Sequence, residues 1–368
     1  MSNQFRELLK KIGSGAHTSK DLSRTEAKEA MQMMLHSQAT PAQIGAYMIA
    51  HRIKRPTAEE LAGMLDAYHE IGPKLKPFEG QSSHLVTVLG TPYDGRNRTS
   101  PVTPITALML AIAGVPIIMH GGDCMPTKFG IPMSEIWQNL GVDFTNLSLI
   151  QAQKLLEKTG LTFVYLPQHF PQANQLVPYR EQIGKRPPIA TLELIWSPYA
   201  GDARIIAGFV HPPTEERFCK TAQLTNNITQ LTTIKGLEGS CDLARSRTGI
   251  IGVCKPDGEP DFERIFLHPH EYGFAGKDVP LESIIQLAKD LQNIIQGKPI
   301  ALMQDAIWNG GFYLWHCGIC ADINTGFAQA EGMLIKGKVA AKLKEITQAI
   351  EVIKSSDRLS RKNRTANC

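Results

Sequence analysis

The first 75 residues carry apolar positions at helical spacing, and polar residues mark where each helix starts. In a capping box, a Ser or Thr and a Glu or Gln three residues later satisfy each other's free backbone amides. Three such pairs occur: Ser23 with Glu26, Thr40 with Gln43, and Thr57 with Glu60. The second helix has one apolar face, formed by Ile44, Tyr47, Met48 and Ile53. This pattern predicts a bundle of three short helices, closed at Gly72, that packs on a second unit or on another subunit.

From residue 84 onward, short apolar runs alternate with amphipathic segments. The runs predict strands at 84–90, 115–120, 161–167, 204–210, 248–253 and 263–267. The amphipathic segments predict helices at 104–114, 133–140, 147–160, 281–297, 301–315 and 332–353. Such alternation is typical of a parallel sheet covered on both faces. We therefore predict an α/β fold: a small N-terminal helical bundle plus a larger domain with a mainly parallel central sheet flanked by helices.

The same pattern divides the chain into three parts. Residues 1–75 are expected to form the helical domain, with a role in dimerisation, and residues 76–353 the α/β domain. The proline-rich stretch 168–200 is expected to pack partly with the helical domain. Residues 354–368 are polar and basic and predict a flexible tail, which is either solvated or touches an anionic surface.

Length and composition limit the class of protein. The 368 residues are enough for two structural units. The net charge of +4 suits an anionic ligand but is weaker than that of a dedicated nucleic-acid binder. The N-terminus lacks the apolar core of a secretion signal, and the longest apolar run, 107–119, is too short to span a bilayer. We therefore expect a cytoplasmic protein with no membrane partner.

The seven cysteines are odd in number and irregular in spacing, which does not resemble a disulfide framework. Reduced thiols are the expectation for a cytosolic protein. Cys317 and Cys320 form one CxxC pair, directly after His316. A zinc site would need a second pair, and the sequence has none, so packing is favoured over redox chemistry or metal binding.

The segment 89–103, LGTPYDGRNRTSPVT, lies between a predicted strand and a predicted helix. Ligands of parallel sheets bind beyond the carboxyl ends of the strands. Glycines let backbone N–H groups approach a phosphate, hydroxyls add donors, and the helix N-terminus is positive. The candidate ligand-binding residues here are Gly90, Thr91, Asp94, Gly95, Arg96, Arg98 and Thr103. The alternative is an ordinary connection, because short loops rich in Gly, Thr and Asp are common.

A second candidate segment, MHGGDCMPTKFG at 119–130, follows the next predicted strand. His120 ends that strand, Gly121 opens the backbone beside it, and Lys128 is within reach of the same pocket. His120 is a candidate catalytic residue, and the alternative is a buried structural histidine.

Together, these segments resemble the anthranilate phosphoribosyltransferase family. The family pattern is a strand, G-T-G-G-D-G, a loop with N-I-S-T, a helix, and a strand ending in K-H-G-N-R. This chain has GTPYDG, SPVT and MHGGD in that order and at the same spacings. The resemblance extends to TPAQIGAYMIAHRIK near the N-terminus, HFP at 169–171, EGSCDL at 238–243 and WNGG at 308–311. It covers nearly the whole chain and implies a diverged member of the nucleoside phosphorylase-like glycosyltransferases.

The resemblance implies a role for each matched residue. The positions that cradle the pyrophosphate of phosphoribosyl pyrophosphate are Gly90, Thr91, Asp94 and Gly95, followed by Thr103, Gly121 and Lys128 around the same ligand. His120 and Arg180 match residues near the acceptor and are the candidate catalytic pair. Asp242 matches one of two acidic residues that bind Mg²⁺, while Leu243 stands at the second position.

Several family positions are replaced. Pro92 and Tyr93 stand where the loop has glycines, which removes one N–H and puts a bulky ring where pyrophosphate would lie. Met119 and Asp123 replace a lysine and an arginine of K-H-G-N-R, which exchanges two positive charges for one negative charge. New basic residues lie nearby: Arg96, Arg98, Lys185, Arg186, Arg245 and Arg247. They form either a solvated basic rim or a pocket with a new anion specificity.

These observations favour a transferase that moves a phosphoribosyl or related pentosyl group to an acceptor other than anthranilate. Its ligand would be a phosphorylated sugar or another anionic small molecule, with Mg²⁺ as the implied cofactor and a homodimer as the implied assembly. The alternative is a non-catalytic paralogue of the same fold that binds nucleic acid. A purely structural dimer is a third interpretation.

Overall fold

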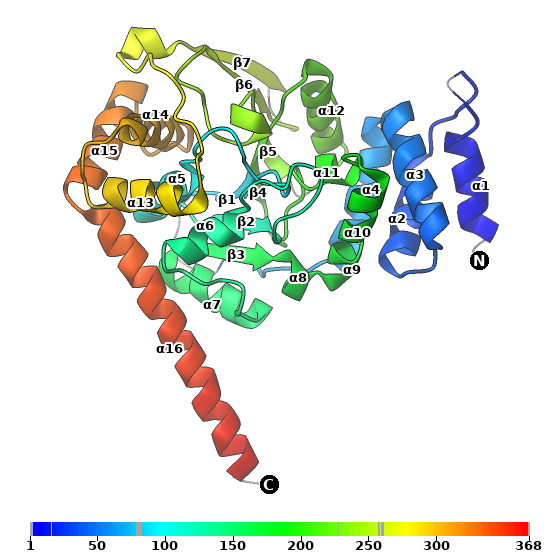
Figure 1. The fold of residues 1–368 in the computed structure, drawn as a ribbon, viewed down its shortest axis with the longest axis horizontal. Coiled ribbons are helices and arrows are strands. Elements are labelled where there is room, and N and C mark those ends of the chain that lie inside the picture. Colours follow the sequence, from blue (N-terminus) through cyan, green and yellow to red (C-terminus); the bar gives the residue numbers. More distant parts are fainter. Residues whose placement is uncertain are drawn as a thin grey trace.

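The computed structural model describes residues 3–15, 17–78, 83–226, 228–256, 258 and 261–366, with side chains up to Ser356. The N-terminal bundle contains α1 (Asn3–Ile12), α2 (Arg24–Leu35), α3 (Pro41–Lys54) and α4 (Ala58–Ile71), which lie at one side of the larger domain (Figure 1). All three capping boxes are present at the starts of α2, α3 and α4, and Gly72 caps α4. The sequence pattern did not predict α1. Ile53 also differs from expectation, because it is 71% exposed.

The larger domain is built on one sheet, which has seven strands within the described residues. Its strands are β1 (Val86–Gly90), β2 (Ile117–Gly121), β3 (Leu161–Tyr165), β4 (Ala203–Gly208), β5 (Ile228–Ile234), β6 (Gly249–Cys254) and β7 (Phe262–Leu267). They lie in the order β3-β2-β1-β4-β5-β6-β7. The first five of this order are parallel, and β6 and β7 are antiparallel to their neighbours. The predicted fold class is therefore confirmed.

Helices cover both faces of this sheet (Figure 1). They are α5 (Thr103–Ile112), α6 (Met133–Asn139), α7 (Leu149–Thr159), α12 (Pro212–Gln223), α13 (Ile284–Ile295), α14 (Ala301–His316), α15 (Ile323–Ile335) and α16 (Lys338–Ala366). The predicted helix at 332–353 is in fact two, because Gly337 has a φ of +68° between α15 and α16. The sequence pattern also missed β5, whose threonines interrupt the apolar run, and α12, which has few apolar residues.

The sheet separates two hydrophobic cores, because successive strand residues point to opposite faces. On one face, Leu89 and Ile206 pack with α5 and the C-terminal helices. On the other face, Val88, Ile118 and Ile205 share a core with the N-terminal bundle. The bundle and this face of the sheet thus contribute to one shared core.

The proline-rich stretch consists of four short helices: α8 (Leu166–His169), α9 (Pro171–Asn174), α10 (Val177–Ile183) and α11 (Ile189–Leu192). Contacts join α10 to α3 and α11 to α4, so this stretch bridges the bundle and the sheet. At the other end, the segment predicted as a flexible tail continues α16 as far as Ala366, and this helix projects from the body (Figure 1). In the part of the chain that is described, no helix combines the length and hydropathy needed to cross a membrane.

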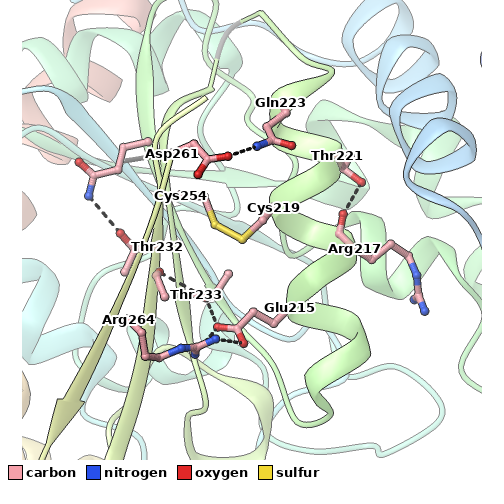
Figure 2. Close-up of a disulfide and its surroundings, with 12 residues drawn as sticks. Glu215, Arg217, Cys219, Thr221, Gln223, Thr232, Thr233, Cys254, Asp261 and Arg264 are labelled. Atoms are coloured by element: carbon pink, nitrogen blue, oxygen red, sulfur yellow. Dashed lines mark hydrogen bonds and ion pairs between the residues drawn. A yellow bond between two sulfur atoms is a disulfide. The ribbon is translucent and has the colours of Figure 1, made fainter. Parts of the chain in front are cut away.

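One pair of cysteines corrects the expectation of reduced thiols. Cys219 on α12 and Cys254 at the end of β6 form a disulfide, with their Cα atoms 5.8 Å apart (Figure 2). The sequence does not reveal this pair, because 35 positions separate the two residues and they meet only through the antiparallel return from β5 to β6. Cys317 and Cys320 are free and buried.

The disulfide leads to a prediction for stability. Because it closes a loop of 35 residues, its reduction is expected to lower the free energy of unfolding by about 3–4 kcal/mol in the chain-entropy account. Urea unfolding with and without a reductant measures this difference. The matched control is the double variant Cys219→Ser, Cys254→Ser, which should be insensitive to reductant. Equal sensitivity of the variant and the native chain would contradict the assignment.

Candidate functional site

The candidate site lies where β1 and β4 run side by side at the centre of the sheet. From β1 the chain proceeds to β2 on one side, and from β4 it proceeds to β5 on the other. Parallel sheets bind ligands at such a reversal of strand order, beyond the carboxyl ends of the strands. Both the Gly90–Thr103 loop, after β1, and the connection from β4 to α12 begin at this edge.

The loop after β1 is joined to the segment after β2 by backbone hydrogen bonds. Arg96 and Ile131 exchange two of them, with N···O distances of 3.2 and 2.7 Å. Gly95 has a φ of +73°, and a Cβ there would lie 2.5 Å from the backbone of Gly130, so only glycine fits. Lys128 donates to the carbonyl of Gly95 at 2.6 Å. The two predicted ligand-binding segments therefore meet, but they bind each other.

Arg96 points inward and is buried. Its Nε lies 3.2 Å from Oε1 of Glu238, and its Nη1 donates to Oδ2 of Asp242 at 2.9 Å and to Ser240 at 2.7 Å. A fixed fork of donors suits such carboxylate partners. The guanidinium thus occupies the space between the loop after β1 and the connection from β5 to β6.

Both carboxylates that face Arg96 are fully engaged. Asp242 accepts the hydroxyl of Thr103 at 2.9 Å and the amide of Val102 at 3.2 Å, in addition to Arg96. Glu238 accepts the amides of Arg98 and Thr99, both at 3.0 Å. Burial alone would raise the pKa of Glu238, but the nearby Arg96 and Lys128 outweigh it and lower the pKa to about 2. Glu238 is therefore a stable anion that serves as an internal counter-ion.

Tyr93 fills the part of the loop where the family has glycines. Its ring is buried, and its hydroxyl lies 2.5 Å from Nδ1 of His120. The His120 ring also makes an edge contact with Trp196, with centroids 5.1 Å apart. Burial lowers the pKa of His120 to about 3, so the imidazole is neutral at physiological pH. These contacts fit a buried structural histidine better than a catalytic residue at an open surface.

Arg180, the predicted acceptor-facing residue, is also buried. It forms a bidentate ion pair with Glu193, in which Nη1 lies 3.1 Å from Oε2 and Nη2 is paired with Oε1. Both side chains are 2% exposed. Because Glu193 neutralises the guanidinium, Arg180 has no free charge to offer a ligand.

These contacts leave almost no space in the loop after β1. The cavity bounded by Thr91, Gly95, Arg96, Thr103 and Ser240 measures about 10 Å³. A single water needs roughly 10–15 Å³ on this scale, so a pyrophosphate does not fit in this conformation. A divalent cation does not fit at Asp242 either, because both carboxylate oxygens already accept hydrogen bonds. Across the described residues, no three His, Cys, Asp or Glu side chains gather as a metal site.

A much larger opening lies next to this closed loop, at the carboxyl end of β4. It has a volume of about 820 Å³ and lies between α3, the segment that leads into α11, and the connection from β4 to α12. We call it the arginine cleft, because Arg52, Arg55, Arg186 and Arg217 line it. Gly239 contributes to its wall, next to Glu238 and Ser240 of the closed loop.

Comparison with known proteins identifies the class. Residues 6–72 match the helical bundle domain of the glycosyl transferase family, and residues 82–340 match its a/b domain. The chain belongs to this family, which confirms the resemblance seen in the sequence. The family and the structural neighbours are glycosyl and phosphoribosyl transferases, in agreement with the prediction of an enzyme.

Individual relatives are similar over nearly their whole length. The anthranilate phosphoribosyltransferase of Acetivibrio thermocellus is 25% identical over 344 residues, which cover 93% of this chain and 96% of the relative. The anthranilate phosphoribosyltransferase of Saccharomyces cerevisiae in complex with PRPP and Mg has a similar fold, with a TM-score of 0.80 at 16% identity, and the match covers 96% of this chain and 99% of the yeast chain. The enzyme from Thermus thermophilus gives a TM-score of 0.76 at 18% identity, over 95% of this chain and 100% of that chain.

The predicted site residues thus separate into two groups. The structure brings most of them together in the closed loop: Gly90, Thr91, Asp94, Gly95, Arg96, Thr103, Lys128 and Asp242. Arg98 lies at its rim with its side chain 75% exposed. His120, Gly121 and Arg180 lie beneath the loop and are buried.

Sequence reasoning missed the partners that close the site and the residues that line the cleft. Glu238 lies in EGSCDL, which resembles a family segment, and Glu193 lies in the proline-rich stretch, but the sequence pattern pointed only to their partners Arg96 and Arg180. Arg52 and Arg55 lie in HRIKRP, a basic run that ends a capped helix, and this run was the available signal. Arg217 lies on α12, which was not predicted.

If Arg96 is removed, the carboxylates that it contacts should become able to bind a metal ion. Arg96→Ala is expected to lower the free energy of unfolding by about 3–5 kcal/mol, because Asp242 would lose its cation and Glu238 would keep only Lys128 and the exposed Arg98. Millimolar Mg²⁺ should restore part of this loss in the variant and leave the native chain unchanged. Chemical denaturation with and without Mg²⁺ measures both effects.

Arg98→Ala is the matched control, since this exposed side chain contacts the same Glu238 at 3.7 Å. It should cost less than about 1 kcal/mol and show no response to Mg²⁺. We interpret the Arg96 guanidinium as occupying the position of a metal ion. This interpretation would be contradicted if Mg²⁺ stabilised the native chain and stabilised Arg96→Ala no more strongly.

Proposed function

We propose that this chain acts on a phosphorylated pentose and transfers a phosphoribosyl or related pentosyl group to an acceptor other than anthranilate. What supports the transfer is membership of the glycosyl transferase family over both domains. The observation that carries the exclusion of anthranilate is the buried Arg180–Glu193 pair. Anthranilate bears a carboxylate, and Glu193 already supplies one to Arg180.

In such a transfer, the bond from C1 of the pentose to the leaving phosphate breaks and a bond from C1 to the acceptor forms, while the acceptor loses a proton. Catalysis then depends on positioning and on neutralising the leaving group. Arginines can supply this neutralisation without a metal-binding carboxylate pair. We extend the proposal to a cytoplasmic homodimer, and analytical ultracentrifugation tests the dimer.

One experiment tests both the transfer reaction and the identity of the acceptor, and its outcomes distinguish the two claims. The native chain is incubated with phosphoribosyl pyrophosphate and Mg²⁺, together with anthranilate or with a panel of uncharged nitrogen heterocycles. Phosphorus NMR follows release of the leaving group, and chromatography identifies the product. We expect release with an uncharged acceptor and none with anthranilate. Turnover of anthranilate would refute the acceptor assignment, and no release with any acceptor would refute the transfer.

A second candidate function is the binding of nucleic acid without catalysis. The observation that favours it is the contrast between the closed loop, about 10 Å³, and the arginine cleft, about 820 Å³. A chain that has lost its small-ligand cradle but keeps four arginines in an open cleft has the charge for a phosphate backbone.

Salt dependence tests this candidate. If the four cleft arginines each contact a phosphate of a single strand, a fourfold rise in salt should weaken binding about 50-fold, from a slope of about −0.7 per contact. Fluorescence anisotropy with a labelled oligothymidylate at two salt concentrations measures the slope. Affinity that stays constant with salt would remove this candidate.

A further inference from the structure

The charged side chains that line the arginine cleft, among the described residues, are all basic. Its four arginines come from three separate parts of the fold: Arg52 and Arg55 from the end of α3, Arg186 from the segment before α11, and Arg217 from α12. His211 also lines it, and none of the described residues that line the cleft is an Asp or a Glu. A cleft lined by charges of one sign attracts counter-ions, so this arrangement favours the binding of an anion.

Two of these guanidinium groups have no hydrogen-bond or ion-pair partner among the described residues. No described residue forms a hydrogen bond or an ion pair with the side chains of Arg55 and Arg217, and burial together with the nearby Arg55 lowers the pKa of Arg217. Arg52 is held in place, because it donates to the backbone carbonyl of Arg186 at 2.6 Å. Arg186 in turn forms an ion pair with Asp94 at 3.7 Å, a distance longer than that of a hydrogen bond.

The helix that carries Arg217 is fixed to the sheet by two independent ties. On its inner side, Cys219 is bonded to Cys254, and Glu215 pairs with Arg264 at 2.7 and 2.8 Å (Figure 2). Figure 2 shows Arg217 projecting from the opposite side of α12, away from β6 and β7. Arg217 is therefore presented by a rigid element, which reduces the entropy lost when it binds a ligand.

The cleft also offers apolar surface beside its charges. Ile53 is 71% exposed and Val210 is 49% exposed, and both line the cleft. Pro212 and Pro213 begin α12, so they add flat surface but supply no backbone N–H at this helix end. Recognition of a phosphate at this helix end therefore rests mainly on side chains, above all the arginines, while a sugar or base can pack against Ile53 and Val210.

We infer that the arginine cleft binds a phosphate ester that carries more than one phosphate group, with its organic part on Ile53 and Val210. The charge of the four arginines calls for several negative charges, and guanidinium groups bind phosphate oxygens in pairs. This inference rests on the proposed function for the phosphorylated class of ligand, but it moves the binding site from the loop after β1 to the neighbouring strand end. The ligand can be a small sugar or nucleoside phosphate, or a strand of linked nucleotides.

Calorimetry with defined probes tests the assignment. Inorganic pyrophosphate, adenosine diphosphate and an oligothymidylate are each titrated into the native chain and into the double variant Arg55→Gln, Arg217→Gln. We expect the native chain to bind adenosine diphosphate more tightly than pyrophosphate. The double variant should bind each ligand at least about tenfold more weakly, since one charge-assisted hydrogen bond contributes about 1.5–3 kcal/mol.

Two single variants serve as controls for charge and for position. Arg6→Gln removes an exposed positive charge on α1. Arg98→Gln removes the exposed arginine at the rim of the closed loop, 3.7 Å from Glu238. Both should bind within about twofold of the native chain, because neither contacts the ligand, and matching thermal unfolding of all variants shows that they fold.

Each outcome bears on the assignment. Loss of binding in Arg98→Gln, with none in the double variant, would return the ligand to the loop after β1 and overturn the inference. Failure of all three probes to bind the native chain would overturn it as well. Binding of the oligothymidylate alone, weakened in the double variant, would support the cleft and identify linked nucleotides as the source. Since these are binding measurements, they can succeed even where the pentosyl transfer assay fails.

Discussion

One buried guanidinium holds the candidate site at the edge of the sheet in its observed form. Arg96 joins the loop after β1 to the connection between β5 and β6, through Glu238, Ser240 and Asp242. An unpaired carboxylate inside a protein costs several kcal/mol, so the three charged groups must be kept or lost together. The same pairing decides what the loop can bind, because the positive charge that a phosphate would seek is already neutralised.

The closed loop and the open cleft are two consequences of one topology. The reversal of strand order at β1 and β4 creates a crevice, and the loops that follow these two strands border it. Here the loop after β1 has been filled by its own side chains, while the prolines after β4 and the end of α3 keep the neighbouring space open. In our proposal, the ligand site is displaced by one strand without any change in the order of the sheet.

Local signals in the sequence predicted local structure well. The capping boxes located α2, α3 and α4, since these signals depend on residues three positions apart. The family pattern located the loop and its neighbours in space. The direction of Arg96 could not be predicted, because an arginine in a loop suits solvent or a buried carboxylate equally well. The Glu193 partner of Arg180 and the Cys219–Cys254 bond depend on distant contacts, and the bond also depends on two elements, β5 and α12, that the apolar pattern did not reveal.

Tyr93 has a consequence for how this fold can change over evolutionary time. Its buried ring supports His120, and replacing such a ring by a small residue costs about 3–5 kcal/mol. A chain with glycine in place of Tyr93 would therefore lose stability without gaining a cradle, because Arg96 would still occupy the loop. Gly90 is also constrained, because a Cβ at this position would lie 2.1 Å from the carbonyl oxygen of Leu194. An open cradle at this loop therefore needs several simultaneous substitutions in this sequence.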